Sequence, residues 1–218
     1  MNLYFKNTNK GESNHVTSIF YQFDKYSYKQ VIYMEMFKKC IGNIFFTELR
    51  TNKQLGYIVK GMSYEIYDHL YYLIIVQGEK KFPDEIDDLI NEVVNISISK
   101  DCSNNFIEIK NAIKYQINRN ENNINERTEK IFKEINMRKN DFEKESQLNK
   151  ELDSIYNYEE VRKYMKNMFV NNPRRIGILY YANNIDDNII NERIQEKIKK
   201  NKKYSLNKDI KIEYLNKI

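Results

Sequence analysis

The order in which hydrophobic patterns follow one another constrains the fold more than any other feature of this sequence. Residues 15–25 are rich in β-branched and aromatic side chains, which predicts a strand. An apolar period of 3.6 residues follows and predicts a helix over residues 28–51, opened by the capping pair Ser27 and Gln30. Two strand-like runs joined near Asp68 then predict an antiparallel hairpin.

Helical patterns dominate the remainder until one final strand. Helices are expected from Pro83, from residue 103, around residues 148–155 and after the cap residue Asn157, with a last strand at residues 176–182. The polar stretch "NRNENNINER" is either a solvent-facing helix or a break. Antiparallel strands with helices gathered after them predict the α+β class, an antiparallel sheet covered on one face by helices.

The length of 218 residues suits one large domain. Residues 1–14 are polar and are expected to form a lead-in loop, and residues 15–182 hold the α+β domain. Residues 183–218 form a charged tail with room for one amphipathic helix, which we do not expect to join the core.

The charge pattern does not favour a nucleic-acid partner. The 36 basic and 31 acidic residues give a net charge of +5, and both signs are interspersed rather than gathered in a patch. The only dense basic cluster, residues 197–203, is expected to be a solvated helix face or a fraying tail. No apolar run is long enough to cross a bilayer, so no membrane partner is expected.

The two cysteines, Cys40 and Cys102, are far apart in the sequence, so a disulfide is not expected. Cys40 falls on the apolar stripe of a predicted helix and is expected to be buried filler. The N-terminus lacks the apolar segment of a signal peptide. We therefore expect a reduced chain in an intracellular, cytoplasmic setting.

No self-contained catalytic centre emerges from the spacing of reactive residues. The two histidines, His15 and His69, are distant from each other, and no H-x-x-E-H, H-E-x-x-H or C-x-x-C spacing exists. Both are expected to be ordinary surface histidines, and no metal site is predicted. Phosphate-binding glycine motifs and the G-x-S-x-G elbow are also missing from the sequence.

The segment "LRTNKQLGYIV", residues 49–59, adds information that spacing does not. It resembles the L-R-T-x-x-Q-L-G-Y-x-V motif of the insulinase/pitrilysin family of zinc metallopeptidases, with eight identities in eleven positions. "SIFYQFDKYS", "LIIVQGEKKFPDEIDDLI" and "NPRRIGILYYA" are similar to the neighbouring segments of the same family. The resemblance covers roughly residues 14–182 and points to the last of four homologous α+β domains.

The resemblance implies a composite active site. In the family, a zinc ion, its H-x-x-E-H ligands and the general base lie in the first domain, so this chain is expected to be inactive alone. The motif's arginine and tyrosine fall on Arg50 and Tyr57, to which the resemblance assigns substrate binding and catalysis. The expected partners are the N-terminal zinc-bearing half of the same enzyme and a peptide substrate. Lys53 departs from the family, where close relatives often carry an acid.

Two other interpretations remain open at this point. One is a catalytically silent family member that acts as a structural or peptide-enclosing subunit, although such a subunit would not need Arg50 and Tyr57. A basic nucleic-acid-binding module is the third. Outside the family context, Arg50 would only complement a helix dipole, and Tyr57 would be one of 18 tyrosines.

Overall fold

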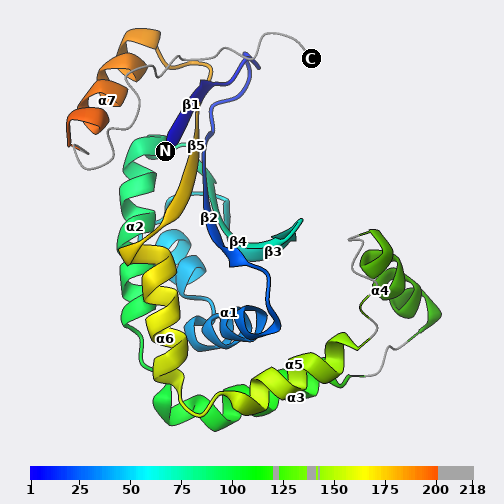
Figure 1. The fold of residues 1–218 in the computed structure, drawn as a ribbon. Coiled ribbons are helices and arrows are strands. Elements are labelled where there is room, and N and C mark those ends of the chain that lie inside the picture. Colours follow the sequence, from blue (N-terminus) through cyan, green and yellow to red (C-terminus); the bar gives the residue numbers. More distant parts are fainter. Residues whose placement is uncertain (120–122, 137–140, 142, 201–218) are drawn as a thin grey trace.

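A computed structural model describes residues 1–119, 123–136, 141 and 143–200. Its centre is a five-stranded sheet with the order β1-β5-β2-β4-β3. Helices cover one face of this sheet (Figure 1), so the predicted α+β class is confirmed. The strands are β1 (Asn2–Lys6), β2 (His15–Lys25), β3 (Ile58–Ile66), β4 (His69–Gly78) and β5 (Arg174–Tyr181).

The helices that follow Ser27 and Asn157 begin where a side chain accepts a hydrogen bond from an early backbone N–H group. The Ser27 hydroxyl accepts a hydrogen bond from the Gln30 N–H at 3.3 Å, and the Asn157 side chain accepts one from the Glu160 N–H at 3.2 Å. The α-helices are α1 (Tyr28–Ile41), α2 (Pro83–Ser99), α3 (Phe106–Ile117), α4 (Ile124–Asn136), α5 (Lys144–Ser154), α6 (Tyr158–Lys166) and α7 (Asp187–Lys200). Three shorter turns are η1 (Phe46–Asn52), η2 (Ser103–Asn105) and η3 (Asn167–Asn171).

The helix expected over residues 28–51 is interrupted, so that prediction is wrong in its extent. Gly42 ends α1 with φ +54° and ψ −127°, a conformation outside the α-helical region. The chain then re-enters a separate helical turn, η1, which carries Arg50. The apolar period runs through both pieces, which is why the pattern did not reveal the break.

The segment expected to be a lead-in loop contains β1. Asn2–Lys6 pairs in parallel with β5, from Asn2 opposite Gly177 to Lys6 opposite Tyr181. The sheet is therefore antiparallel except at this edge. A five-residue strand whose partner lies at the far end of the chain leaves too short a local pattern to be recognised.

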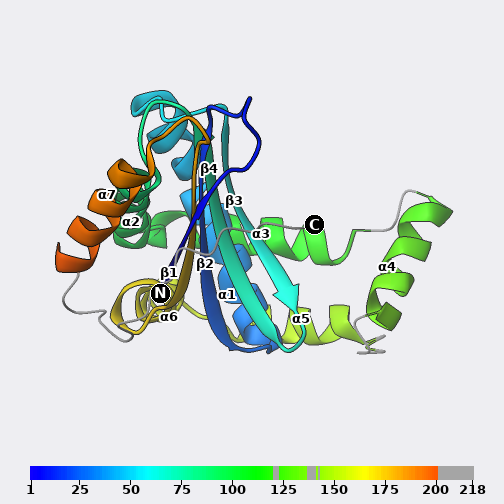
Figure 2. The ribbon, with the colours of Figure 1, turned by 90° about the horizontal axis from the view of Figure 1, so that it is seen from above.

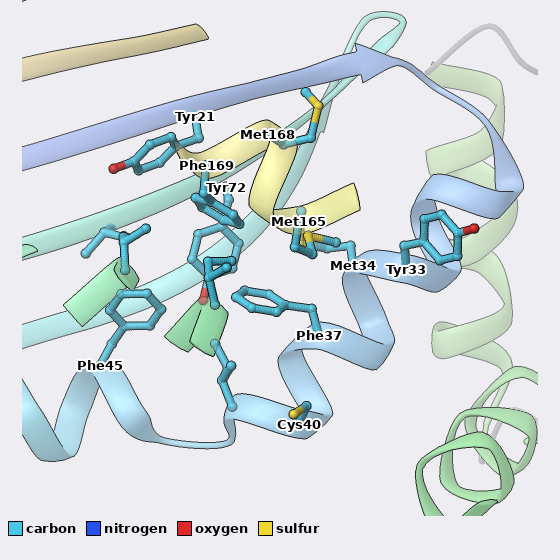
Figure 3. Packing of buried hydrophobic residues seen from close by; sticks show 14 of the residues in the cluster. Tyr21, Tyr33, Met34, Phe37, Cys40, Phe45, Tyr72, Met165, Met168 and Phe169 are labelled. Atoms are coloured by element: carbon cyan, nitrogen blue, oxygen red, sulfur yellow. The ribbon is translucent and has the colours of Figure 1, made fainter. Parts of the chain in front are cut away.

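The main core lies between the sheet and α1, α2, α3, α5 and α6. Rings from both layers meet there: Phe169 lies 4.8 Å from Tyr21, 5.5 Å from Phe37 and 5.6 Å from Tyr72 between ring centroids. Figure 3 shows these rings converging beneath the strands. Tilted and edge-on rings of this kind pack favourably, so the cluster fixes α1 and η3 on the sheet.

A disulfide joins Cys40, in the last turn of α1, to Cys102, just before α3. The Cα atoms are 5.9 Å apart and both residues are buried. Cys40 is in the core as expected, but the prediction of unpaired, reduced cysteines is wrong. The pairing depends on how two distant helix ends meet, which spacing along the chain does not give.

Helix α7 packs on α2 and on the β1–β5 edge of the sheet. Ile190 and Ile194 form a second buried cluster with residues of these strands. Lys197, expected on a solvated face, is only 5% exposed and pairs with Asp87 at 3.3 Å and with Asp88. Residues 201–218 of the charged tail, including part of the basic cluster, lie outside the described residues. Within the described ranges, no helix is both long enough and apolar enough to span a bilayer.

Candidate functional site

The site predicted from residues 49–59 is built on a tight connection between η1 and β3. Leu49 and Leu55 are fully buried and anchor its two ends. The Leu55 N–H donates to the Leu49 carbonyl at 3.0 Å, and the Lys53 N–H donates to the Glu48 carbonyl at 3.0 Å. The Lys53–Glu48 bond spans five residues, so η1 is a wide, π-type helical turn. Such turns are rare in proteins overall, and those that occur are often found at functional sites.

A close approach of two glycines fixes where this connection meets the sheet. A Cβ on Gly56 would lie 1.8 Å from the Gln77 carbonyl oxygen, and one on Gly78 would lie 2.1 Å from the Leu55 carbonyl oxygen. Neither position therefore accepts a side chain without a backbone shift. The Tyr57 N–H donates to the Gln77 carbonyl at 3.0 Å, so Tyr57 is held against β4 as β3 begins.

Gln54 completes the turn with φ +51°, a left-handed conformation that is uncommon for a residue with a side chain. Its side-chain oxygen accepts a hydrogen bond from Lys80 at 3.2 Å. Lys53 pairs with Glu92 of α2 at 3.1 Å. These contacts tie the turn to the segment after β4 and to α2, which restricts the backbone that carries Arg50 and Tyr57.

Arg50 lies on the exposed side of η1, directly after the buried Leu49. Its guanidinium carbon is 5.0 Å from the centroid of the Phe46 ring, a cation–π contact. Within the described part of the chain, it forms no ion pair and donates no hydrogen bond. All its N–H donors are therefore available to a ligand, while the ring limits how far the side chain swings.

Tyr57 is 73% exposed, and its hydroxyl has no hydrogen-bond partner among residues 1–119, 123–136, 141 and 143–200. The structure places Arg50 and Tyr57 at the two ends of one turn and leaves both side chains exposed. No hydrogen bond or ring contact joins them in the described residues. A cavity of about 360 Å³ is lined by Phe46, which contacts Arg50, by Phe45 and by residues of β3 and β4.

The histidines do not form a metal site. His15 was expected at the surface but is buried, and its Nδ1 accepts a hydrogen bond from the Ala182 N–H at 3.0 Å. Burial, and secondly the charge of Arg193, lower the pKa of His15 below its ordinary value of 6.5. His69 is half-buried at the start of β4. Nowhere in the described ranges do three or more His, Cys, Asp or Glu side chains gather as metal ligands would.

Sequence reasoning missed the residues that support the site. Phe46 stands four positions before Arg50, a spacing that makes two side chains neighbours on a helix, so this contact was detectable. Gly78 has no comparable local signal, because its role depends on the strand that returns beside Gly56.

Comparisons with known proteins agree with this architecture. Residues 36–132 match the sequence model of the family described as PQQ synthase PqqF-like, C-terminal lobe domain 4. No curated protein matched the chain by sequence. Among solved structures, the crystal structure of pitrilysin is similar with a TM-score of 0.69 and 15% identity over 85% of this chain and 20% of that one.

Two further structures share the fold. The periplasmic protease PqqL from Escherichia coli matches with a TM-score of 0.63 and 12% identity, over 83% of this chain and 20% of that one. A peptidase M16 inactive domain from Pseudomonas fluorescens matches with a TM-score of 0.61 and 10% identity, over 84% of this chain and 43% of that one. The chain thus spans between a fifth and less than half of these proteins' length.

The fold is that of the α+β domains from which larger peptidases are built. The family match and the shared fold confirm the resemblance found in residues 49–59, and they support a C-terminal domain of an insulinase/pitrilysin-family peptidase.

Proposed function

We propose that this chain is the C-terminal domain of an insulinase-like zinc metalloendopeptidase that degrades peptides, and that it supplies Arg50 and Tyr57 to a composite active site. The observation that carries the proposal is that buried residues hold the backbone of this turn in place while the polar groups of Arg50 and Tyr57 are exposed. Leu49 and Leu55 are buried, whereas Arg50 and Tyr57 project from the same turn, and their polar ends have no hydrogen-bond or ion-pair partner within the part of the chain that the structure describes.

The chemistry of the two side chains suits peptide-bond hydrolysis. Negative charge grows on the scissile carbonyl oxygen as the tetrahedral state forms, and the Tyr57 hydroxyl would donate a hydrogen bond to that oxygen. The Arg50 guanidinium offers several donors in a fixed plane and would bind backbone carbonyls beside the scissile bond. The cavity beside Phe46, which Asn43 and Lys60 line together with apolar residues, would accept a substrate side chain.

The metal would come from elsewhere in the parent enzyme. The described residues do not fit a zinc site, and the sequence contains no H-x-x-E-H motif. In the parent, zinc would supply the activated water. The chain alone is accordingly expected to be inactive, and its partners would be the N-terminal zinc-bearing half and the peptide.

Replacing Tyr57 tests the proposal directly. In the full-length product of the gene that encodes this sequence, Tyr57→Phe is expected to lower kcat on an unstructured peptide by about 10²–10³-fold with KM nearly unchanged, because one transition-state donor is lost. Tyr67→Phe is the matched control, since Tyr67 is 88% exposed at the tip of the same hairpin and is not assigned a role. Equal kcat values for Tyr57→Phe and the control would remove Tyr57 from the mechanism.

A second candidate function is a catalytically silent subunit that encloses or presents peptides. The Pseudomonas fluorescens relative is itself described as an inactive domain, which favours this candidate. A full-length product that lacks H-x-x-E-H, has no zinc-bearing partner and binds peptides without cleaving them would support it over the peptidase.

The cytoplasmic location stays a prediction. The Cys40–Cys102 disulfide weighs against it, because cytosolic thiols are kept reduced, and one structural relative is a periplasmic protease.

A further inference from the structure

The cavity beside Phe46 lies at one edge of the sheet. β3 is the last strand in the sheet order, and it lies on the side away from α2 and α7 (Figure 2). Residues of β3 and of the segment between α1 and η1 line the cavity together. Its volume of about 360 Å³ is near the lower end of the range for ligand pockets, about 300–1,000 Å³. It therefore suits a single amino-acid side chain better than a large ligand.

Aromatic and aliphatic side chains form most of the cavity wall. Phe45 and Val59 are buried, whereas Phe46 is 43% exposed. The Phe46 ring also contacts the Arg50 guanidinium, whose central carbon lies 5.0 Å from the ring centroid. A side chain that enters the cavity would therefore belong to a peptide that passes beside Arg50.

Tyr72 of β4 brings a buried hydroxyl group to the cavity. The residue is only 2% exposed, and its ring lies 5.9 Å from that of Phe45 between centroids (Figure 3). A Cβ on Gly61 would lie 2.7 Å from the Tyr72 oxygen, so the hydroxyl is next to the bare backbone of β3. Among the residues that the structure describes, this hydroxyl has no hydrogen-bond partner. Burial raises the pKa of Tyr72 above its ordinary value of 10.0, so the group stays a donor at neutral pH.

Lys60 of β3 brings a positive charge to the same cavity. Of the described residues that line it, Lys60 alone is charged. Lys60 is exposed, and it forms no ion pair in the described ranges. Glu48, the acid closest to Arg50 in the sequence, accepts a hydrogen bond from the Asn52 side chain at 3.1 Å and does not line the cavity. The cavity thus presents an ammonium group and a buried hydroxyl donor without a carboxylate to pair with them.

These groups discriminate between the kinds of side chain that could enter. An apolar side chain would cover the Tyr72 hydroxyl and leave a buried donor unpaired, which costs free energy. A basic side chain would place a second positive charge beside Lys60. A glutamine could accept a hydrogen bond from Tyr72, but it would not neutralise Lys60. A glutamate satisfies all three conditions, because its methylene groups contact the apolar wall and its carboxylate accepts from both donors.

We propose that this cavity is a subsite for an acidic residue, in which Lys60 and Tyr72 select a glutamate of the bound peptide. The inference rests on the proposed function, since it takes the ligand of Arg50 to be a peptide. Lys60 determines the preference for negative charge, and Tyr72 determines the preference for an acceptor over an apolar group. Both are specificity-determining residues, and neither takes part in bond cleavage.

Cleavage of matched peptides by the zinc-loaded, full-length gene product tests the subsite. The peptides carry Glu, Gln, Met or Lys at one position, which is moved residue by residue along an otherwise constant sequence. At one position, kcat/KM for Glu should exceed that for Gln by about tenfold, because a charge-assisted hydrogen bond is stronger than a neutral one. Gln should in turn be preferred over Met, and Lys should be the poorest residue.

Variants assign the preference to the two residues. Lys60→Met should remove the preference for Glu over Gln, and Lys60→Glu should favour Lys over Glu. Tyr72→Phe should remove the preference for Gln over Met. Lys10→Met is the control and should keep the wild-type order, since Lys10 is exposed between β1 and β2 and does not line the cavity. Raising NaCl from about 50 to 500 mM should weaken the preference for Glu, because salt screens the exposed charge of Lys60.

The outcomes separate this inference from the proposed function. If the peptides are cleaved with equal kcat/KM values, or if Lys60→Met keeps the preference for Glu, the subsite is wrong and the peptidase stands. If no peptide is cleaved, the peptidase proposal fails, and fluorescence anisotropy with the same peptides decides the subsite. The Glu peptide must then bind the wild type more tightly than the Gln peptide, and this difference must vanish in Lys60→Met. Equal or undetectable binding overturns the subsite as well.

Discussion

At the scale of single residues, the close approach of Gly56 and Gly78 fixes the position of the Tyr57 backbone. Gly78→Ala would place a Cβ 2.1 Å from the Leu55 carbonyl oxygen and 2.7 Å from the Gly56 Cα. Because the neighbouring atoms are backbone, the turn must shift, and we expect unfolding to become easier by about 1–3 kcal/mol. Urea denaturation of the chain measures this. Gly11→Ala is the control, since the added Cβ would lie 3.7 Å from its nearest neighbour, the side-chain oxygen of Asn9. Equal midpoints for both variants would contradict the tight contact.

His15 gives a residue-scale prediction for pH. Its folded pKa is lowered by burial and by Arg193, while Asp84, Glu79 and Glu85 act in the opposite direction. The unfolded state therefore binds more protons, so stability is retained above about pH 6.5 and falls as the pH drops from there toward the lower folded pKa. The slope in that window should not exceed about 1.4 kcal/mol per pH unit.

His15→Asn is the matched variant for this effect, because its side-chain oxygen can still accept from the Ala182 N–H without titrating. Thermal unfolding of both proteins from pH 5 to pH 8 measures the difference. The wild type should lose more stability than the variant below pH 6.5, and parallel curves would show that His15 does not titrate as expected.

Some residues of the molecule could be predicted from the local sequence, whereas others depend on partners that are distant in the sequence. Arg50 and Tyr57 stand in one contiguous motif, so the sequence alone was enough to propose both, and their roles stay predictions. Gly78, His15 and Lys197 owe their roles to partners many residues away, namely Leu55, Ala182 and Asp87. Side-chain chemistry alone placed His15 and Lys197 at the surface, and only the packing of β5 and α7 explains their burial.

At the scale of elements, the local hydrophobic pattern predicted most strands and helices. It did not predict contacts between segments that are distant in the sequence. β2 matches its expected bounds because eleven residues alternate clearly, but β1 has five residues and a partner at the other end of the chain. The Cys40–Cys102 disulfide is another such joint, and it links the end of α1, just before η1, to the segment that leads into α3.

Reducing this disulfide is expected to lower the free energy of unfolding by about 2–5 kcal/mol, because the bond closes a long loop in the unfolded chain. Melting curves with and without dithiothreitol measure the effect on the wild type. The double variant Cys40→Ala/Cys102→Ala is the control and should not respond to the reductant. Two alkylatable thiols in the unreduced, unfolded protein would show that the bond is not formed.

At the scale of the whole molecule, stability is expected to differ between two parts. One part, the body, is the sheet with its packed helices, and the other, the arm, is helix α4. The body contains the sheet and the helices of the main core, whereas α4 stands apart from it (Figure 1). A single helix of 13 residues is marginal in water without tertiary packing. Its exposed apolar side chains therefore contribute little until something covers them.

Hydrogen exchange should reveal this division. In the 218-residue chain, the amides of α4 are expected to exchange by local opening at near-zero free energy, while those of β2 and β4 exchange only on global unfolding. Adding subdenaturing urea should accelerate β2 and β4 and leave α4 nearly unchanged, because local fraying exposes little new surface. α3 is the internal control, since Ile109 and Ile113 bury it in the core. Protection of α4 equal to that of α3 in a monomer would mean that the arm is stabilised within the chain itself, and it would remove the need for an external cover.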